Sequence, residues 1–491
     1  MRTDPGPLAN VGTWLELHAA ERPGHAALIV EPTGERISYR ELEARVRRTA
    51  SALAALGVGP GDRVALALPS EPLYLELYFA AALVGAIAVP LNTRLTAAEL
   101  GFQLDDAEPR VAIRAPGRDL PERLGTLALS PDELRACLPA RAPRVTPAPG
   151  GEAPQVILYT SGTTGQPKGA VLPHRKTYWN TRNAEHYLEL DSSSVVVCPI
   201  PLFHSFGLKI LSLPALYCGA TLVLVDRFDA LGLQECIARH RATLLGAVPV
   251  MYARMLEAGL APEKLASLRF AFSAGAPLAT ETIEGYFAAG ICLSQGYGQT
   301  ETSILCCLDA ADARRKAGSV GRPVPFGEVR IADAEGRVCA PGARGEVQVR
   351  GPIVMLGYWH RSEETAASRV DGWHRTGDLG VADSEGFVTL VGRSKELYIS
   401  GGENVYPAEI ERVLGQHGNV SEVAVVGVPD ERWGEAGRAY VVPARQPFDS
   451  AELLAWAGER LARYKLPREI VVVAELPRTA SGKVQKHALP D

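Results

Sequence analysis

The stretch "YTSGTTGQPKGAV", residues 159–171, decides how the chain is interpreted. It follows the apolar run 156–159 and combines threonine and serine hydroxyls, three glycines and Lys168. Hydroxyls and glycine N–H groups donate hydrogen bonds, and a lysine adds positive charge, so this mixture is typical of a phosphate-binding loop. The apolar run predicts a buried strand. The loop would then leave a sheet edge, where open α/β folds bind their ligands.

This loop is not a Walker A motif. Such a motif needs Gly, four residues and then Gly-Lys-Ser/Thr, whereas here Lys168 is preceded by Pro167 and followed by Gly169. The segment "SGK" at 481–483 also fails, because Pro477 stands where the first glycine belongs. Phosphate must be held by another geometry, in which the glycines at 162, 165 and 169 would permit positive φ and close backbone approach. For the loop by itself, a polar surface turn is the alternative.

Composition indicates an ordinary soluble globular protein. The chain has 491 residues, of which 46% are hydrophobic and 22% charged, enough for two or more domains. A net charge of −5 without a long basic run argues against nucleic acid or an anionic membrane as partner. The eight cysteines lack metal-ligand spacing, so we expect them reduced and mostly buried. We expect a cytoplasmic protein without a membrane span, because residues 73–91 indicate a buried helix running into a strand and the N-terminus lacks an apolar signal segment. A monomer or homodimer is expected.

Apolar runs alternate with helical patterns after the Pro-rich segment 139–154. Strands are predicted at 195–198, 221–225, 244–248, 268–272 and 291–293, and helices at 231–240, 250–258 and 278–288. This alternation predicts an α/β fold with mostly parallel sheets wrapped by helices. Short β segments beyond residue 320 predict a β subdomain. A compact α+β pattern follows, with a helix from Pro407, strands at 422–427, 438–442 and 470–474, and a helix at 451–463.

Four further motifs follow the loop in order. They are "GYGQTE" (296–301), "RTGDLG" (375–380), "GRSKELYISGGENVYPAEIE" (392–411) and "PRTASGK" (477–483). Together with the loop, they resemble the adenylate-forming superfamily of AMP-forming acyl-CoA synthetases, firefly luciferase and peptide-synthetase adenylation domains. The resemblance covers nearly the whole chain. It implies a large N-terminal domain, 1–394, that binds ATP and the acid, and a small mobile C-terminal domain, 395–491, that carries the catalytic lysine.

The resemblance assigns one set of residues to ATP: Thr160, Ser161, Gly162, Thr163, Thr164, Gly165, Lys168, Gly275, Ala276, Tyr297, Gly298, Asp378 and Arg393. The loop residues would cradle the β and γ phosphates, and the backbone around Gly275 would lie beneath the adenine. Tyr297 would stack on that base, although a tyrosine between glycines is more often packing. Asp378 would hold both ribose hydroxyls, because a carboxylate accepts two hydrogen bonds at once. Arg393 would assist it.

The resemblance also assigns catalytic roles. Glu301 corresponds to the magnesium-binding carboxylate, a hard oxygen ligand for a hard cation, and Thr300 to a donor to the α-phosphate. Lys483 corresponds to the lysine that stabilises charge while a carboxylate attacks the α-phosphate. Lys395 stands at the hinge about which the C-terminal domain turns, bringing in residues 400–404 for the second half-reaction. A solvated Glu301 and an exposed Lys395 are the plain alternatives.

The acceptor thiol is expected to be that of coenzyme A. The residues assigned to it are Gly401, Gly402, Glu403, Trp433 and Arg468. Leu466, however, occupies a position where some relatives place a basic residue. This departure leaves the phosphopantetheine of a carrier protein as an alternative acceptor.

The acid pocket is assigned to His204, Phe206, Leu208, Val248, Ser273, Ala274, Gly296 and Gly298. His204 is also assigned to the catalytic residues, and in one interpretation it gates this pocket, since relatives have an aromatic residue or a histidine here that moves as the carboxylate enters. In the competing interpretation it is a buried histidine bonded to backbone. Lys209 follows nearby, and we expect it to face outward.

Two positions indicate the kind of acid. Amino-acid-activating relatives place an Asp after the Phe of this segment to pair with an ammonium, whereas here Phe203 is followed by His204. A buried ammonium without a carboxylate is costly. Malonate-type ligases carry an Arg immediately before the "YG" of their motif, where this chain has Gly296. Gly296 and Gly298 would instead leave space, which suits a bulky apolar acid.

The resemblance therefore implies magnesium- and ATP-dependent activation of an apolar carboxylic acid, followed by transfer to coenzyme A with release of AMP and pyrophosphate. The acid would be aryl, arylpropenoic, medium- or long-chain aliphatic, or polycyclic. A carrier-loading enzyme, a succinylbenzoate–CoA ligase, a luciferase-like oxygenase and a non-catalytic nucleotide-binding protein remain alternatives. The presence of Lys483, Glu301 and Asp378 together argues against the last, because binding alone does not require the lysine.

Overall fold

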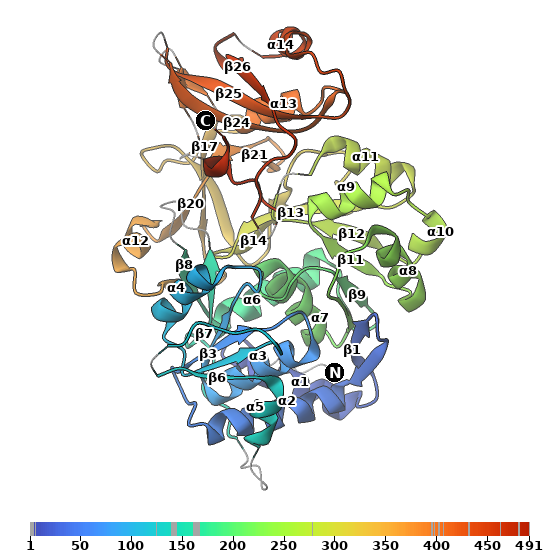
Figure 1. Cartoon of the computed structure of the whole chain (residues 1–491), viewed down its shortest axis with the longest axis vertical. Helices are drawn as coiled ribbons and strands as arrows, with labels where there is room; N and C mark the ends of the chain where they lie inside the picture. The colour runs from blue at the N-terminus through green and yellow to red at the C-terminus, as the bar shows by residue number, and fades with distance from the viewer. Residues whose placement is uncertain are drawn as a thin grey trace. The chain divides into compact units, whose positions relative to one another are not determined.

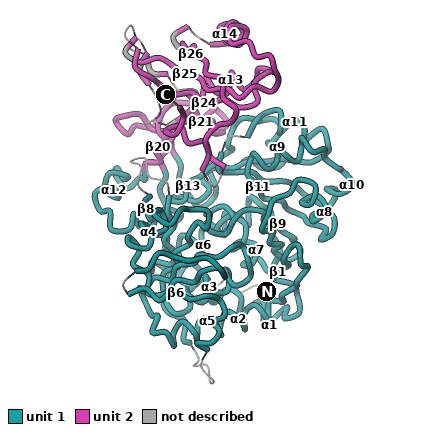
Figure 2. The backbone as a smooth tube through the Cα atoms, viewed as in Figure 1, with its two compact units in different colours: residues 1–329, 349–374 teal, residues 330–348, 375–491 magenta. Residues whose placement is uncertain are grey.

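A computed structural model describes residues 4, 6–123, 125–138, 145–160, 167–276, 278–393, 396, 398–400, 403–405, 407–430, 433–461, 463–479 and 482–490. The chain divides into two compact units, one of residues 1–329 and 349–374 and one of residues 330–348 and 375–491 (Figure 2). The predicted boundary between residues 394 and 395 stays a prediction. The segments 330–348 and 375–393 group with the residues that follow that boundary.

The first sheet of the first unit contains the strand that leads into the phosphate-loop motif. Its order is β18 (Gly357–Tyr358), β8 (Lys168–Pro173), β7 (Pro154–Thr160), β4 (Ile87–Pro90), β3 (Arg63–Ala67), β5 (Val111–Arg114) and β6 (Leu127–Leu129) (Figure 1). Neighbours from β7 to β6 are parallel, whereas β7 and β8 form an antiparallel pair that joins Thr160 to Lys168. The predicted strand at 156–159 is confirmed. The loop residues 161–166 lie outside the described residues.

Gly169 in β8 has a different role from the one expected. A positive φ was expected there, but Gly169 is not among the left-handed glycines, so that expectation is wrong. Packing requires a glycine here, because a Cβ at this position would lie 2.6 Å from Cγ2 of Ile157. Close approach of its backbone to phosphate stays a prediction.

The second sheet places the other site strands. Its order is β15 (Arg322–Pro323), β14 (Ser303–Cys307), β13 (Leu293–Gln299), β12 (Phe270–Ser273), β11 (Leu244–Ala247), β9 (Val195–Cys198), β10 (Thr221–Val225), β1 (Ala26–Glu31) and β2 (Glu35–Ser38). Neighbours from β13 to β1 are parallel, and the flanking strands β14, β15 and β2 are antiparallel. The carboxyl ends of parallel strands meet at one edge, so the residues after β11, β12 and β13 gather there.

Helices cover both sheets of the first unit. They are α1 (Trp14–Glu21), α2 (Tyr39–Ala55), α3 (Pro72–Val84), α4 (Ala97–Ala107), α5 (Pro131–Ala136), α6 (His174–Tyr187), α7 (Leu213–Tyr217), α8 (Ala230–His240), α9 (Pro249–Glu257), α10 (Pro262–Leu265), α11 (Thr280–Ala288) and α12 (Ser362–Ala367). Helix α3 is apolar and buried from Leu73 to Val84, as predicted. Helix α6 contacts β8 of the first sheet and β14 of the second, and it is buried although it is largely polar.

The second unit holds a small α+β arrangement. A third sheet, most of whose residues belong to this unit, has the order β16 (Glu328–Ala332), β17 (Arg344–Arg350), β20 (Trp373–Ala382) and β19 (Arg369–Val370), with β21 (Val388–Arg393) beside β20. Strand β19 and the ends of β16, β17 and β20 are counted with the first unit. A fourth has the order β23 (Glu403–Val405), β22 (Tyr398–Ser400), β25 (Gly434–Pro443) and β24 (Val420–Asp430), with β26 (Glu469–Val472) beside β25. Helices α13 (Pro407–Leu414) and α14 (Ser450–Gly458) bury Ile410 and Leu453 in one core.

The predicted α/β fold class is confirmed, with shifts in element bounds. The strands at 195–198 and 221–225 match, whereas those expected at 268–272 and 291–293 lie at Phe270–Ser273 and Leu293–Gln299. Strand β13, Leu293–Gln299, contains two glycines and three polar residues. Its extended form therefore follows from pairing with its neighbouring strands and not from an alternating apolar pattern. The helix expected at 451–463 ends at Gly458.

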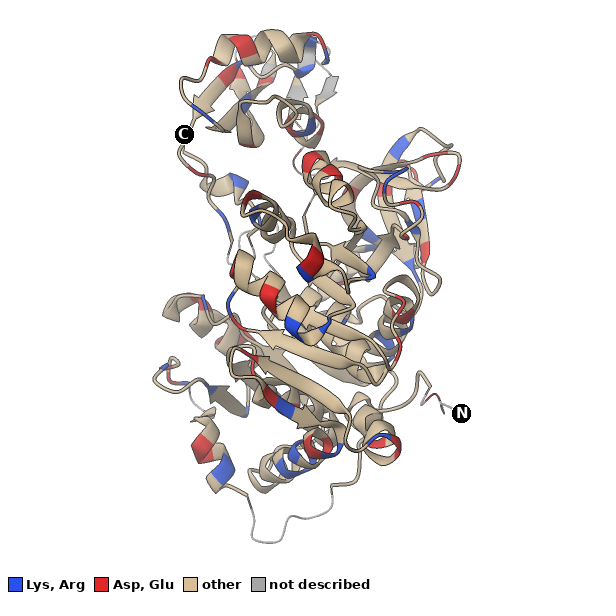
Figure 3. Cartoon of the chain, turned by 90° about the vertical axis from the view of Figure 1, so that its right-hand side faces the viewer, with Lys and Arg blue, Asp and Glu red and all other residues tan. Residues whose placement is uncertain are grey.

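The cysteines, the charged residues and the apolar helices can be compared with the expectations from composition. All eight cysteines are free, and Cys198, Cys218, Cys236 and Cys306 are buried. Basic and acidic residues are interspersed in the view of Figure 3, and they form surface pairs such as Arg45 with Glu41. None of the helices in the described part of the chain has the length and apolar character that a bilayer crossing demands.

Candidate active site

The predicted magnesium ligand lies on a tight turn between β13 and β14. Glu301 is central in this turn, residues 300–302, and its backbone carbonyl accepts from the N–H of Met355 at 2.8 Å. The Glu301 side chain is buried, and its Oε1 accepts from Oγ1 of Thr160 at 3.3 Å. The structure therefore brings Glu301 together with the residue that enters the phosphate loop. The two are 141 residues apart in sequence.

Tyr358 in β18 belongs to this cluster and was missed by the sequence analysis. Its hydroxyl donates to Oε1 of Glu301 at 3.0 Å. Burial, and then the adjacent carboxylate, raise the pKa of Tyr358, so the phenol stays protonated and remains a donor. Lys168 has its Nζ 5.6 Å from the centre of the Tyr358 ring and 3.8 Å from the carboxylate of Glu364. The loop residues Ser161, Gly162, Thr163, Thr164 and Gly165 lie outside the described residues.

The residues predicted to surround adenine occupy two neighbouring strand ends. Tyr297 is buried in β13. Gly275 and Ala276, after β12, are exposed, and Gly275 has a φ of +92°, which favours glycine. Gly298 is required for another reason, because a Cβ there would lie 1.8 Å from the carbonyl oxygen of Ser303. Their contacts with ATP stay predictions.

The residues predicted to hold the ribose lie in the second unit. Asp378 in β20 and Arg393 in β21 are register partners in an antiparallel pair, and the Asp378 side chain is buried. Glu346, which the sequence analysis missed, accepts from the N–H of Gly377 at 3.0 Å and from Nε of Arg375 at 2.7 Å. Glu346 therefore fixes the backbone immediately before Asp378.

The predicted catalytic lysine stands on an ordered turn of the second unit. Lys483 is exposed, its backbone carbonyl accepts from the N–H of Thr479 at 2.7 Å, and its own N–H donates to Oγ1 of Thr479 at 3.1 Å. Arg478 Nη1 donates to the carbonyl of Gly482 at 2.6 Å and its Nη2 to Glu422 at 2.6 Å. The hydrogen bonds fix the backbone that presents Lys483.

Two of the predicted coenzyme A residues are brought together. The guanidinium of Arg468 lies 5.9 Å from the centre of the Trp433 ring, and Asp430 accepts from the N–H of Trp433 at 2.9 Å. Trp433 is exposed. Leu466 packs on the hydrophobic core of the unit, and this packing explains why an apolar residue stands at position 466. Gly401, Gly402, Lys395 and the Glu403 side chain lie outside the described residues.

His204 is half-buried at the start of the predicted acid pocket. Its ring lies 4.4 Å from that of Phe203, centre to centre. Burial, and then Arg94, lower the pKa of His204 to about 4, so the imidazole is neutral at pH 7. Its Nε2 is buried and has no hydrogen-bond partner among the described residues. Binding of this nitrogen to backbone, the competing interpretation, finds no support there.

An aromatic residue that was not predicted packs against Phe206 of the predicted acid pocket. The ring of Phe272 in β12 lies 5.9 Å from Phe206 in an edge-to-face arrangement and 5.6 Å from Tyr187. Phe206 and Leu208 belong to a π-helical segment, Phe206–Ser212, and Leu208 is buried. Ser273 and Ala274 are buried as well, and Val248 is half-buried. The structure therefore places Phe272 against the predicted pocket segment.

The expectation that Gly296 and Gly298 leave open space is wrong. A Cβ on Gly296 would lie 2.8 Å from Cζ of Phe272, and one on Gly298 would meet the backbone of Ser303. The protein itself occupies the volume that these glycines free. Their membership of the pocket stays a prediction.

The expectation that Lys209 faces outward is also wrong. Lys209 is 1% exposed, and its ammonium donates to the hydroxyl of Tyr78 at 3.2 Å, to Oε1 of Gln155 at 3.3 Å and to Oγ1 of Thr177. Three acceptors satisfy its three donor positions. Burial and then the neighbouring Lys176 lower the pKa of Lys209 well below its usual value.

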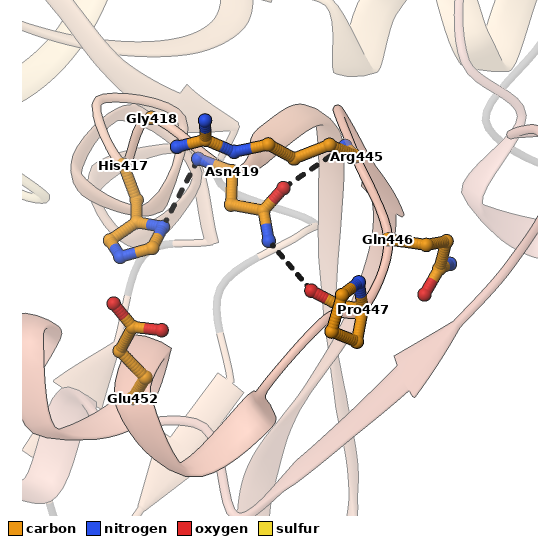
Figure 4. Close-up of a pocket in the computed structure, with 7 residues that line it drawn as sticks. All are labelled: His417, Gly418, Asn419, Arg445, Gln446, Pro447 and Glu452. Carbon is orange, nitrogen blue, oxygen red and sulfur yellow. Dashed lines mark hydrogen bonds between the residues drawn. The ribbon is translucent and has the colours of Figure 1, made fainter.

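A surface hollow of the second unit lies outside the predicted site (Figure 4). Asn419 lines this hollow, and both polar groups of its side chain bond to the backbone. Its Oδ1 accepts from the N–H of Arg445 at 3.0 Å, and its Nδ2 donates to the carbonyl of Pro447 at 3.4 Å. The backbone N–H of Asn419 donates to Nδ1 of His417 at 3.4 Å. These bonds tie two loops together.

Comparison with known proteins identifies the family of the chain. The model of the AMP-binding enzyme family matches residues 15–359, and that of the AMP-binding enzyme C-terminal domain matches residues 409–483. The chain is 40% identical to a feruloyl-CoA synthase of an Amycolatopsis species over 97% of both chains. It is 40% identical to an indoleacetate–CoA ligase of Aromatoleum aromaticum over 96% of both.

A solved structure is similar over the full length. The o-succinylbenzoate coenzyme A synthetase of Bacillus subtilis, in complex with ATP and magnesium ion, superposes with a TM-score of 0.88 at 34% identity, covering 98% of this chain and 99% of that one. The chain therefore belongs to the AMP-binding enzyme family. The predictions of an adenylate-forming enzyme, and of an acid–thiol ligase of the acyl-CoA synthetase class, are confirmed.

Proposed function

We propose that this enzyme activates an apolar carboxylic acid with ATP and transfers the acyl group to coenzyme A. The observation that carries the proposal is the contact of Thr160, Glu301 and Tyr358, which joins the phosphate loop and the "GYGQTE" motif within one unit. In the first half-reaction, the carboxylate attacks the α-phosphorus of ATP and pyrophosphate leaves. In the second, a thiol attacks the acyl carbon and AMP leaves.

The residues beside the phosphate loop fit a magnesium ion. Both hydrogen bonds that the described residues make to the Glu301 carboxylate go to Oε1, which leaves Oε2 to bind a cation. Tyr358 and Thr160 fix the orientation of the carboxylate, and hard oxygen ligands suit Mg²⁺. When bound, the ion supplies charge neutralisation to phosphate oxygens. We infer that Thr300 donates to the α-phosphate from the same turn, and that Lys168 contacts the terminal phosphates.

Lys483, Asp378 and Arg393 complete the adenylation machinery in this proposal. Asp378 is buried beside an ordered backbone, as a residue that accepts two ribose hydrogen bonds needs to be. Lys483 stabilises the negative charge that develops at the α-phosphate. Movement about Lys395 then exchanges Lys483 for the residues 400–404 in the second half-reaction.

The acid is an aryl or arylpropenoic acid, or a medium- to long-chain or polycyclic aliphatic acid. Phe206, Leu208 and Phe272 supply apolar and aromatic surface. His204 provides no carboxylate to pair with the ammonium of an amino acid, and Gly296 provides no cation to pair with a second carboxylate. His204 is neutral at pH 7, and its Nε2 has no hydrogen-bond partner among the described residues, so in the tautomer that protonates Nε2 it can donate to the entering carboxylate. The two 40%-identical relatives are named for aromatic acids, which favours the aryl class.

Coenzyme A is the proposed acceptor. The paired Trp433 and Arg468 offer an aromatic face and a guanidinium, the groups that suit an adenine ring and its phosphates. A carrier-protein phosphopantetheine remains the second candidate because Leu466 replaces a basic residue of some relatives.

The test is to incubate the enzyme with Mg·ATP and a panel of acids, and to identify the thioester by mass spectrometry. Cinnamic, benzoic or fatty acids should give acyl-CoA when coenzyme A is present. A thioester that forms on a carrier protein and not on coenzyme A would reverse the choice of acceptor. Activation of amino acids or malonate in preference to apolar acids would refute the choice of substrate.

A further inference from the structure

Lys176 in α6 is a buried lysine to which the proposed chemistry gives no role. It is 1% exposed, and its ammonium donates to Oγ of Ser303. Within the described residues, no carboxylate lies within ion-pair distance of its Nζ. A buried ammonium without such a partner is costly, so a lysine at this position needs a compensating interaction.

The residue that Lys176 binds ends the turn that carries Glu301. Ser303 is the first residue of β14, it is buried, and its φ is +62°. A left-handed conformation is unfavourable for a serine, and it is maintained only where surrounding contacts hold it. Antiparallel strands are often connected by a short turn that includes a left-handed residue. Here residues 300–302 connect β13 to β14, and Ser303 is the left-handed residue. The bond from Lys176 is therefore placed at the strained position of this turn.

The Glu301 carboxylate also acts on the charge of Lys176. Burial lowers the pKa of Lys176 to about 7, and the nearby Glu301 carboxylate opposes that shift. The backbone on the other side of the turn is held by Met355, whose N–H donates to the Glu301 carbonyl. Lys176 and Met355 therefore hold the turn from the two elements that flank it, α6 and the segment before β18.

We propose that Lys176 is a positioning residue for adenylation, which holds the turn bearing Thr300 and Glu301 in place through Ser303. This inference rests on the proposed roles of Thr300 and Glu301 toward the α-phosphate and magnesium. Lys176 itself touches neither ATP nor the acid. Its effect is confined to the first half-reaction, because thioester formation from a preformed acyl-adenylate needs no magnesium-bound pyrophosphate.

The test uses the full-length enzyme with Lys176→Met, which removes the donor and keeps the side-chain length. The kcat/KM for Mg·ATP should fall on the order of ten- to a hundredfold, as expected for a displaced reactive group. Thioester formation from a supplied acyl-adenylate should stay within about twofold. An unchanged kcat/KM for Mg·ATP, or equal losses in both half-reactions, would overturn the proposal.

Two further variants separate positioning from general loosening of the fold. Ser303→Ala removes the acceptor and should cause the same selective loss, with no additional loss in the double variant, because the two residues act as one pair. This variant also carries the test if Lys176→Met does not fold, and additive losses would count against the pair. Lys209→Met is the matched control, since it removes an equally buried lysine that does not contact Ser303. It should lower the melting temperature and leave kcat/KM for Mg·ATP within about twofold; an equal loss of kcat/KM in this control would overturn the proposal.

A wild-type enzyme that forms no adenylate from any acid would count against the proposed function. That result is distinct from failure of the positioning role, which requires an active wild type whose variants show no selective loss. Adenylation by the wild type, with the selective loss in Lys176→Met, supports both.

Discussion

Gly298→Ala should abolish most adenylation, because the new methyl group has no room. Its Cβ would lie 1.8 Å from the carbonyl oxygen of Ser303 and 2.7 Å from Cα of Ile304, both backbone atoms that cannot rotate away. An ordinary contact is about 3.5 Å, so β14 must recede by more than an ångström. The turn at 300–302 connects these strands and moves with them. A misplacement of about 1 Å near the reacting atoms costs on the order of a hundredfold in rate.

The assay is pyrophosphate release at varied Mg·ATP with a saturating preferred acid. Gly298→Ala should lower kcat/KM for Mg·ATP on the order of a hundredfold. Gly24→Ala is the control for a glycine-to-alanine change, because no atom lies within 4 Å of its Cβ position. Gly296→Ala is a second comparison, because its Cβ would lie 2.8 Å from Cζ of Phe272 and 3.2 Å from the carbonyl oxygen of Cys306. Displacement of the Phe272 ring should raise the KM for a bulky acid. Wild-type kcat/KM for Mg·ATP in Gly298→Ala would refute the reasoning.

Lys483→Ala should slow adenylation by about a hundred- to a thousandfold while largely sparing thioester formation from a supplied acyl-adenylate, and equal losses measured in the two half-reactions would contradict its assignment. Tyr358→Phe removes the donor to Glu301 and should reduce kcat/KM for Mg·ATP on the order of tenfold, with a rise in the magnesium concentration needed for half-maximal rate; an unchanged magnesium requirement would count against this contact. His174 accepts from the N–H of Val11 through Nδ1, and burial lowers its pKa to about 3. The unfolded state therefore binds the proton more tightly than the folded state. The contribution of His174 to the unfolding free energy is complete above about pH 6.5 and is lost as pH falls toward 3, and the loss reaches about 2 kcal/mol at pH 5. The fall in unfolding free energy between pH 7 and 5, measured by urea denaturation, should be smaller in His174→Asn, and an identical fall would show that His174 does not titrate as described.

The fold was predictable where local pattern and tertiary environment agree. The apolar run before the phosphate loop became β7, and the apolar stretch 73–91 became α3 and β4. Strand β13 was predicted at 291–293 but lies at Leu293–Gln299, because Gly296, Tyr297 and Gly298 show no alternation of apolar and polar residues. Its extended form depends on hydrogen bonds to β12 and β14, which local sequence does not report.

Site residues were predictable where they belong to a sequence motif with a known chemical function. They were not predictable where a single side chain contacts the site only because the fold buries it there. Glu301 and Thr160 belong to recognisable motifs and were found in contact. The burial of Lys176 and Lys209 was missed because a lysine is expected at the surface. It depends on partners distant in sequence, Ser303 for Lys176 and Gln155 for Lys209. Tyr358 was missed because a lone tyrosine after a glycine carries no signal of a carboxylate 57 residues away.

Formation of an acyl-adenylate from an apolar acid is tested most directly by ATP–pyrophosphate exchange in the absence of coenzyme A. Exchange requires reversible attack of the carboxylate on ATP and does not depend on the acceptor. Wild-type enzyme with magnesium and cinnamic or another apolar acid should catalyse exchange, and the Lys483→Ala enzyme should lose most of it. Exchange that depends on amino acids or malonate, or that no apolar acid stimulates, would contradict the proposed activity.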